Sequence, residues 1–218
     1  AGYHIYTSID PDVQKQLQSS VDNALSGYTE KDKNGIYKTQ ASGTCIDNDT
    51  GKVVAIVGGR EQKNIGYTLN RAFQSPRQPG SAIKPLLVYA PALEHGWSAG
   101  STVNDSPMST KDKNRVRNSH GSYSGQISLR RAVQKSSNVA TMRIYEQLTP
   151  KTCLKYLEEM NFKYLTDSDY KYYTTCIGGF TKGTTSEEMA AGYATLKNDG
   201  VYRDCLLYTS PSPRDRSL

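Results

Sequence analysis

The chain has 218 residues, of which 36% are hydrophobic, and it carries a formal net charge of +6. This length fits one large domain or two small ones and allows a sizeable buried core. Lysine and arginine are scattered among acidic residues, which argues against the basic stripe of a nucleic-acid-binding protein. The positive charge is therefore read as ordinary solubility or as residence near an anionic surface.

The four cysteines, Cys45, Cys153, Cys176 and Cys205, form no C-x-x-C pair. The three histidines show no metal-ligand spacing with them. We therefore expect no zinc site, no other metal and no cofactor, and the spacing assigns no disulfide.

The chain begins at Ala1 without a methionine, and its sequence shows neither a signal peptide nor a membrane-spanning run. We expect it to be a piece of a longer protein, so the sequence alone does not indicate where that protein resides.

A strand and a helix are predicted at the N-terminus. Residues 3–9 alternate and are rich in Tyr, Ile and Thr, which is typical of a short strand. Asp10 and Pro11 then have the pattern of an N-cap followed by proline at the first helical position. The helix should end at Gly27, before a polar loop over residues 28–38. Its apolar positions recur in steps of four, at Val13, Leu17, Val21 and Leu25.

A β-hairpin is predicted next, with strands over residues 40–46 and 52–58 and a turn over residues 48–51. Residues 53–57 are apolar without interruption, so we expect this strand to be covered on both faces. Residues 61–80 are expected to form a loop.

A second helix is predicted over residues 81–95, and Pro91 should kink it. The polar segment that follows, residues 96–124, is long for a compact domain, and such segments are usually functional or flexible. The sequence leaves open whether this one gates a groove or only decorates it. The buried side of the helix is predicted to carry Leu86, Leu87, Tyr89, Ala90 and Leu93.

A helical pattern resumes after Ser128, which is a good N-cap. Polar residues interrupt the pattern at 135–138 and predict a turn between two helices. A further helix is predicted from Pro150 through Met160.

The last helix is predicted over residues 185–197. Thr185 or Ser186 would cap it, with Glu188 near the third helical position.

The final stretch, residues 204–218, has no periodicity and contains alternating prolines. Such a pattern is typical of a disordered tail. It also resembles the translated adapter sequence that recurs at the ends of metagenome-derived reading frames. We prefer this interpretation and assign residues 1–203 to the domain and 204–218 to a non-native tail.

Two residues in the predicted helix over 81–95 carry reactive groups. Ser81 and Lys84 are three residues apart, so on a helix they share one face. A serine hydroxyl is a weak nucleophile and needs an adjacent base, which a neutral lysine can supply. This is the S-x-x-K arrangement of serine acyl-transfer enzymes. Ser168 and Lys171 repeat the spacing, so the spacing alone is not specific.

A second constellation lies at the turn over residues 136–138, which reads Ser-Ser-Asn and is the sole S-x-N in the sequence. Ser136 could relay a proton between Lys84 and a leaving amine, and the Asn138 amide could bind both Lys84 and a substrate amide. Serine and asparagine also favour turns for purely local reasons. The combination with S-x-x-K favours the functional interpretation.

The motifs together resemble the transpeptidase domain of class A, bifunctional penicillin-binding proteins. The resemblance covers roughly residues 3–203, with the motifs in family order. It is carried by residues 3–10 and 54–59, by RQPGSAIKP over 77–85, by SGQISLRRA over 124–132 leading into 136–140, and by GGFTKG over 178–183.

The resemblance implies a role for each site residue. Ser81 would be the acylated nucleophile and Lys84 the general base, while Ser136 and Asn138 would complete the proton relay and hold substrate. The substrate would be the D-Ala-D-Ala end of a peptidoglycan stem peptide, and β-lactam antibiotics would acylate the same serine. The parent protein would carry an upstream glycosyltransferase domain and an N-terminal membrane anchor. The domain would lie on the extracytoplasmic face of the bacterial membrane.

One motif of the family is absent from the sequence. No K-[ST]-G occurs in the 218 residues, and residues 182–184 read K-G-T, in another order. The family places this motif on a sheet-edge strand that binds the substrate carboxylate and supplies an oxyanion donor. We expect the motif to lie beyond the predicted tail junction. Without that strand, we expect the 218 residues alone to react with penicillins weakly at most.

The fold class implied is α/β of the α+β type, with helices packed on an antiparallel sheet, as in penicillin-binding transpeptidases and serine β-lactamases. We expect the sheet to be incomplete because the C-terminal strands are missing. Alternatives within the fold are a serine β-lactamase and a D,D-carboxypeptidase. An alternative of another class is a non-catalytic penicillin-sensing or wall-binding module.

Overall fold

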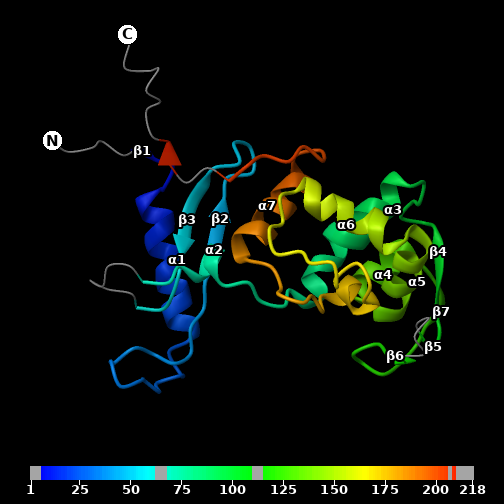
Figure 1. Cartoon of the computed structure of the whole chain (residues 1–218), viewed down its shortest axis with the longest axis horizontal. Coiled ribbons are helices and arrows are strands. Elements are labelled where there is room, and N and C mark those ends of the chain that lie inside the picture. The colour runs from blue at the N-terminus through cyan, green and yellow to red at the C-terminus, as the bar shows by residue number, and fades with distance from the viewer. Residues whose placement is uncertain (1–5, 62–67, 110–114, 206–207, 210–218) are drawn as a thin grey trace, which may run out of the picture. The chain divides into compact units, whose positions relative to one another are not determined.

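The computed structural model describes residues 6–61, 68–109, 115–205 and 208–209 (Figure 1). It divides into two compact units, one of residues 1–76 with 185–218 and one of residues 77–184. The described strands pair two by two, always antiparallel, and helices pack against the β2–β3 and the β4–β7 pairs. The fold class is thus α+β, as predicted.

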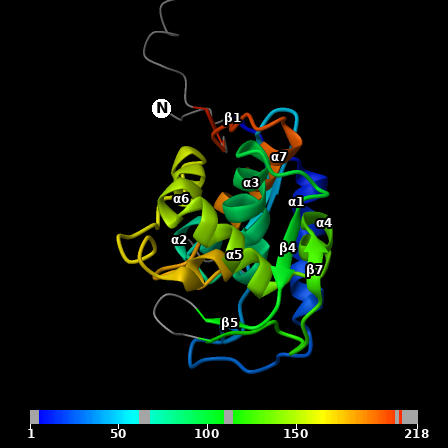
Figure 2. The same ribbon diagram turned by 90° about the vertical axis from the view of Figure 1, so that its right-hand side faces the viewer.

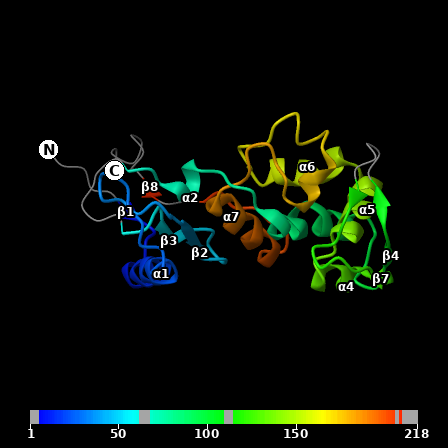
Figure 3. The ribbon, with the colours of Figure 1, turned by 90° about the horizontal axis from the view of Figure 1, so that it is seen from below.

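The first unit is built around the predicted hairpin. Strands β2 and β3 pair antiparallel, and in Figures 1 and 3 they lie between helices α1 and α7. The unit comprises β1 (Tyr6–Thr7), α1 (Pro11–Ala24), β2 (Gly43–Ile46), β3 (Val53–Val57), α2 (Arg71–Gln74), α7 (Ser186–Lys197) and β8 (Tyr208–Thr209).

Local capping signals set the helix boundaries of this unit. The Asp10 side chain accepts hydrogen bonds from the backbone N–H groups of Asp12 and Val13, at 2.9 and 3.1 Å, so α1 begins where predicted. Thr185 and Glu188 form the predicted capping box of α7.

Two predictions in this unit need correction. Residues 54 and 56 of β3 are only half-buried, so the strand is not fully covered on both faces. This follows from α1, which contacts β3 but has no fully buried residue. The predicted loop over 61–80 contains the short helix α2, whose first turn Asn70 caps.

Parts of four predictions lie outside the described residues, among them residues 62–67 of the loop predicted over 61–80 and residues 110–114 of the polar segment over 96–124. Residues 3–5 of the first strand do so, while Tyr6 and Thr7 form β1. Most of the predicted tail also does, apart from 204–205 and the two residues of β8, which pair with β1. The tail assignment and its boundary stay predictions.

The second unit is organised around helix α5, which contacts β4, α6 and the two irregular helices η2 and η3. Figure 2 shows α5 between α6 and the β4–β7 pair. The unit comprises η1 (Gly80–Ile83), η2 (Pro85–Tyr89), α3 (Ala90–Glu94), β4 (Thr102–Asp105), β5 (Met108–Ser109), β6 (Arg115–Val116), β7 (Gly125–Ser128), α4 (Leu129–Gln134), α5 (Asn138–Leu148), α6 (Pro150–Glu159) and η3 (Tyr173–Ile177).

Apolar side chains from several of these elements form its core. Burial of this surface supplies the main favourable free energy of folding. Fully buried side chains include Ile83, Leu86, Leu87, Met142, Ile144, Leu154 and Leu157.

The predicted helix over 81–95 is not one α-helix. It consists of a 3-10 turn (η1), a π-helical turn (η2) and a short α-helix (α3). Pro85 has no N–H to donate, so the ladder of hydrogen bonds changes register there, and the N–H of Ala90 donates to the Pro85 carbonyl. Pro91 is the second residue of α3, which starts directly after the π-helical turn, and the kink expected there stays a prediction.

The polar segment over 96–124 is not a plain loop. It contains β4, β5 and β6, and it leads into β7, which pairs with β4. The turn predicted at 135–138 is present between α4 and α5, and the helix predicted from Pro150 is α6.

Candidate active site

Hydrogen bonds within the second unit hold the segment before Ser81 in place. Arg77 and Thr184 exchange two backbone hydrogen bonds, both of 2.8 Å. The Gln78 side chain donates to the Phe180 carbonyl at 2.5 Å and accepts from the Phe180 N–H at 2.6 Å. Four hydrogen bonds thus fix the chain immediately before the candidate nucleophile.

A close backbone approach tightens this arrangement further. Gly178 has φ +93°, and a Cβ atom added there would lie 2.2 Å from the carbonyl oxygen of Gly80. Only glycine fits this position, both for its conformation and for the contact. The residue preceding Ser81 is therefore packed directly against the 178–184 segment.

Ser81 and Lys84 are joined through the 3-10 turn, in which the Lys84 N–H donates to the Ser81 carbonyl. Their side chains have different surroundings, because Ser81 is exposed whereas Lys84 is 2% exposed. A hydroxyl open to solvent thus lies one turn before a buried amine. Among the described residues, no hydrogen bond joins Ser81 Oγ to Lys84 Nζ, and such contacts are often formed only with substrate present.

The Lys84 ammonium meets three acceptors from one turn of the chain. Its Nζ lies 2.8 Å from the Ser136 carbonyl oxygen, 3.1 Å from Ser136 Oγ and 2.7 Å from Asn138 Oδ1. The two parts of the site are more than 50 residues apart in sequence. The structure thus brings together Lys84, Ser136 and Asn138, as the motif analysis predicted.

Burial changes the acidity of this amine. It lowers the pKa of Lys84 from 10.5 to about 8, and the nearby Cys176 thiol opposes the shift. Desolvation acts this way because it disfavours the charged form of the amine. A substantial fraction of Lys84 is therefore neutral at mildly alkaline pH and able to accept a proton.

Asn138 is held in one amide orientation. Its Nδ2 donates to the Arg117 carbonyl at 2.9 Å, so its Oδ1 is the atom that faces Lys84. The neighbouring Ser136 has φ +48°, an uncommon value for a residue with a side chain. Residues in such conformations persist where the surroundings over-determine them, and they cluster at functional sites.

Three buried polar residues behind this turn were missed by the motif analysis. Asp105, Asn118 and Ser137 are 0%, 3% and 0% exposed and hydrogen-bond to one another. Asp105 and Asn118 belong to the polar segment over 96–124, whose composition gave no sign of burial. Residues 125–134, which form β7 and α4, separate this segment from the S-x-N turn, so no local sequence signal linked the two.

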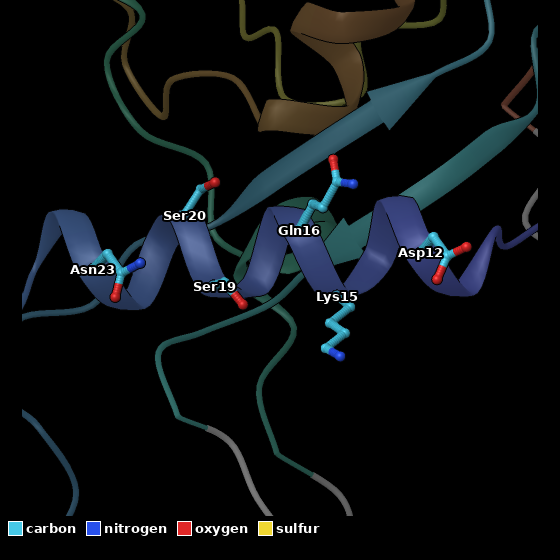
Figure 4. Close-up of a pocket in the computed structure, with 6 residues that line it drawn as sticks. All are labelled: Asp12, Lys15, Gln16, Ser19, Ser20 and Asn23. Carbon is cyan, nitrogen blue, oxygen red and sulfur yellow. The ribbon is translucent and has the colours of Figure 1, made fainter.

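A shallow depression on the first unit, of about 570 Å³, lies along α1 (Figure 4). Its lining side chains all come from this single helix, so the depression is an open polar helix face. None of the predicted site residues lies there. The lining consists of Asp12, Lys15, Gln16, Ser19, Ser20 and Asn23.

Residues 41–213 match the family described as the penicillin-binding protein transpeptidase domain. A serine and a buried lysine that meets an S-x-N turn agree with this class of serine acyl-transfer protein. The chain belongs to this family, and the resemblance stated from its motifs is confirmed.

Curated relatives agree with this assignment. The chain is 36% identical over 228 residues to penicillin-binding protein 1A of Clostridium perfringens (strain 13 / Type A), covering 95% of this chain and 33% of the relative. It is 34% identical over 202 residues to penicillin-binding protein 4 of Bacillus subtilis (strain 168), covering 92% of this chain and 30% of the relative. The chain thus spans about a third of the length of these relatives.

Solved structures agree on the fold. The structure of PonA1 from Mycobacterium tuberculosis in complex with penicillin V is 23% identical and superposes with a TM-score of 0.74, covering 94% of this chain and 54% of that one. Penicillin-binding protein 1A from Haemophilus influenzae is 27% identical with a TM-score of 0.66, covering 83% and 28%.

Proposed function

We propose that this chain is the acyl-transfer part of a peptidoglycan D,D-transpeptidase, with Ser81 as nucleophile and Lys84 as general base. The observation that carries the proposal is the buried amine of Lys84, which follows an exposed serine by one turn and meets Ser136 and Asn138. Family membership supports the same reaction class.

In the proposed reaction, Ser81 Oγ attacks the carbonyl carbon of the penultimate D-Ala of a stem peptide, and its proton passes to neutral Lys84. The proton then moves through Ser136 Oγ to the leaving D-Ala amine as the C–N bond breaks. The acyl-enzyme ester is finally attacked by an amine of a second stem peptide, which releases Ser81. A β-lactam acylates Ser81 by the same first step.

The proposed partners follow from this reaction. They are peptidoglycan stem peptides and β-lactam antibiotics, with a glycosyltransferase domain upstream in the parent protein. Because peptidoglycan is cross-linked outside the membrane, we place the domain on the extracytoplasmic face. Over the described ranges, the structure contains no helix long and apolar enough to cross a bilayer.

The test is to incubate the 218-residue chain with benzylpenicillin and to follow adducts by intact-mass spectrometry and peptide mapping. We expect one adduct per chain, on Ser81, and none in Ser81→Ala. Ser168→Ala is the matched control and should react like the wild type. A chain that stays unmodified after prolonged incubation even when a K-[ST]-G strand from a relative is joined to it would contradict the proposal.

The adduct should form slowly, because no K-[ST]-G occurs in these residues and one missing oxyanion donor can cost about 10²–10³ in rate. Joining a K-[ST]-G strand from a relative to the chain should restore a comparable factor. The lifetime of the adduct separates transferase from hydrolase. A persistent adduct supports the transpeptidase, whereas rapid consumption of penicillin would indicate a β-lactamase.

A further inference from the structure

Two buried polar side chains of the 96–124 segment form a fixed pair. Asn118 Nδ2 donates to Asp105 Oδ1 at 2.7 Å and to the Ser122 carbonyl at 2.9 Å. The other carboxylate oxygen, Asp105 Oδ2, accepts from the Ser124 N–H at 3.0 Å. With its amide nitrogen held in this way, Asn118 can present only its oxygen to the rest of the structure.

That oxygen lies at the start of α5. Asn118 Oδ1 accepts from the backbone N–H groups of Asn138 and Val139, at 2.9 and 3.2 Å. The next N–H, of Ala140, donates to Ser137 Oγ at 3.0 Å, and Ser137 Oγ in turn donates to Asp105 Oδ1 at 2.8 Å. The first three N–H groups of a helix have no intrahelical partner, and here the cluster satisfies all three.

The same cluster borders the turn that contacts Lys84. Ser137 lies between Ser136 and Asn138, the two residues whose oxygens face the Lys84 amine. The Arg117 carbonyl, one residue before Asn118, orients the Asn138 side chain. Residues 117 and 118 therefore fix both the backbone and the side chain of Asn138.

We propose that Asp105 and Asn118 are positioning residues of the acyl-transfer site, which hold the 136–138 turn so that its three acceptors converge on Lys84 Nζ. This inference rests on the proposed function, because it assigns the pair a role in that reaction. Neither residue touches Ser81 or substrate in the proposal, and both act through the turn.

A single substitution at Asp105 or at Asn118 should break the hydrogen bonding of the pair without changing the size of either side chain. In Asn118→Asp the oxygen that caps α5 remains, but the second oxygen now faces Asp105 Oδ1 and the Ser122 carbonyl. In Asp105→Asn either amide orientation puts an N–H group against a donor, since Asn118 Nδ2 lies on one side and the Ser124 N–H on the other. We expect each variant to slow acylation of Ser81 by about 10–100-fold, as small displacements of catalytic groups do.

The double variant Asp105→Asn/Asn118→Asp is the decisive comparison. The new amide at 105 can donate to the new carboxylate at 118 and still accept from the Ser124 N–H. We expect it to recover about tenfold in acylation rate over the single variants. The control Leu157→Val removes one buried methylene from α6 and should lower Tm while leaving the acylation rate unchanged.

A second readout does not depend on acylation. Titration of the Lys84 side chain by NMR should show the pKa moving upward from about 8 in Asp105→Asn, because a loosened turn admits water. Loss of the Asp105 charge alone would instead lower the Lys84 pKa, since removing a carboxylate favours the neutral amine.

These measurements separate the two proposals. A chain that forms no adduct even with a K-[ST]-G strand joined to it overturns the proposed function, while the Lys84 titration still tests the positioning role. Single variants with wild-type acylation and an unmoved Lys84 pKa would overturn the inference. The inference would also be overturned if the double variant combined the full losses in acylation rate of the two single variants and left the Lys84 pKa unchanged.

Discussion

The chain contains the S-x-x-K spacing twice within one unit, at Ser81–Lys84 and at Ser168–Lys171. In both copies the lysine N–H donates to the serine carbonyl, at 3.0 Å in the second copy, so the local backbone is alike. The lysine side chains differ. Lys84 is buried against three acceptors, whereas Lys171 is exposed on a turn.

The difference comes from tertiary structure rather than spacing. The residue inside the second copy, Asp169, is buried and accepts from Thr166 and Thr181, so that copy organises a surface loop. The first copy is followed by apolar residues that pack into the core and place Lys84 under the 136–138 turn. A hydroxyl and an amine three residues apart therefore become a candidate site only where burial and acceptors meet the amine.

The largest expected effect comes from removing the two lysines separately. Lys84→Met should slow acylation of Ser81 by about 10²–10⁴-fold, the usual contribution of a general base. Lys171→Met should leave the rate unchanged. Stopped-flow or mass-spectrometric rates with benzylpenicillin measure both, and equal losses in the two variants would contradict the distinction between the copies.

The next effect tests the packing that holds the first copy. Gly178→Ala would drive a methyl group into the Gly80 backbone, beside Ser81. We expect a loss of about 3 kcal/mol in the free energy of unfolding and acylation slower by about tenfold or more. Gly35, in the first unit, also has a positive φ, of +77°, but nothing lies within 4 Å of an added Cβ.

Gly35→Ala is therefore the matched control. This variant should lower the free energy of unfolding by about 1–2 kcal/mol, from backbone strain alone, and leave the acylation rate unchanged. Chemical denaturation and adduct formation are measured on both variants. Similar behaviour of the two would show that the contact with Gly80 is unimportant.

Much of the fold that carries the site was predictable because its signals are local. The caps at Asp10, Ser128 and Thr185, and the turn after α4, depend on residues adjacent in sequence. The meeting of Lys84 with Ser136 and Asn138 was expected only because both motifs were already associated with one chemistry. Spacing alone ranked Ser168 and Lys171 equally.

Other features were not predictable from pattern. Periodicity does not reveal the 3-10 and π turns around Pro85, and these turns change which residues face the core. Leu93, predicted to be buried, is 51% exposed, whereas Val88 is fully buried. Asp105 and Asn118 are polar residues in a polar segment, and their burial depends on partners that only the folded chain supplies.

The pH dependence of acylation tests whether the buried Lys84 is the base. Because burial lowers the Lys84 pKa to about 8, the neutral base becomes about tenfold more abundant from pH 6 to pH 7. The acylation rate should follow this rise and level off above pH 8. A rate that is flat from pH 6 to pH 8 would rule out Lys84 as the titrating base.

The smallest effect is on stability. Lys84 releases its proton at a lower pH in the folded chain, at about 8, than in the unfolded chain, at 10.5. Between these values the unfolded chain binds more protons, so the contribution of Lys84 to the free energy of unfolding increases with pH. Relative to Lys84→Met, the wild type should gain about 1 kcal/mol from pH 7 to pH 9. Urea denaturation at both pH values measures this gain, and comparison with the same variant cancels the titration of buried thiols and phenols. In Lys171→Met the free energy of unfolding should change with pH as it does in the wild type, since removing an exposed amine leaves the coupling of Lys84 to folding intact. The same pH dependence in Lys84→Met would contradict a buried Lys84 amine with a lowered pKa.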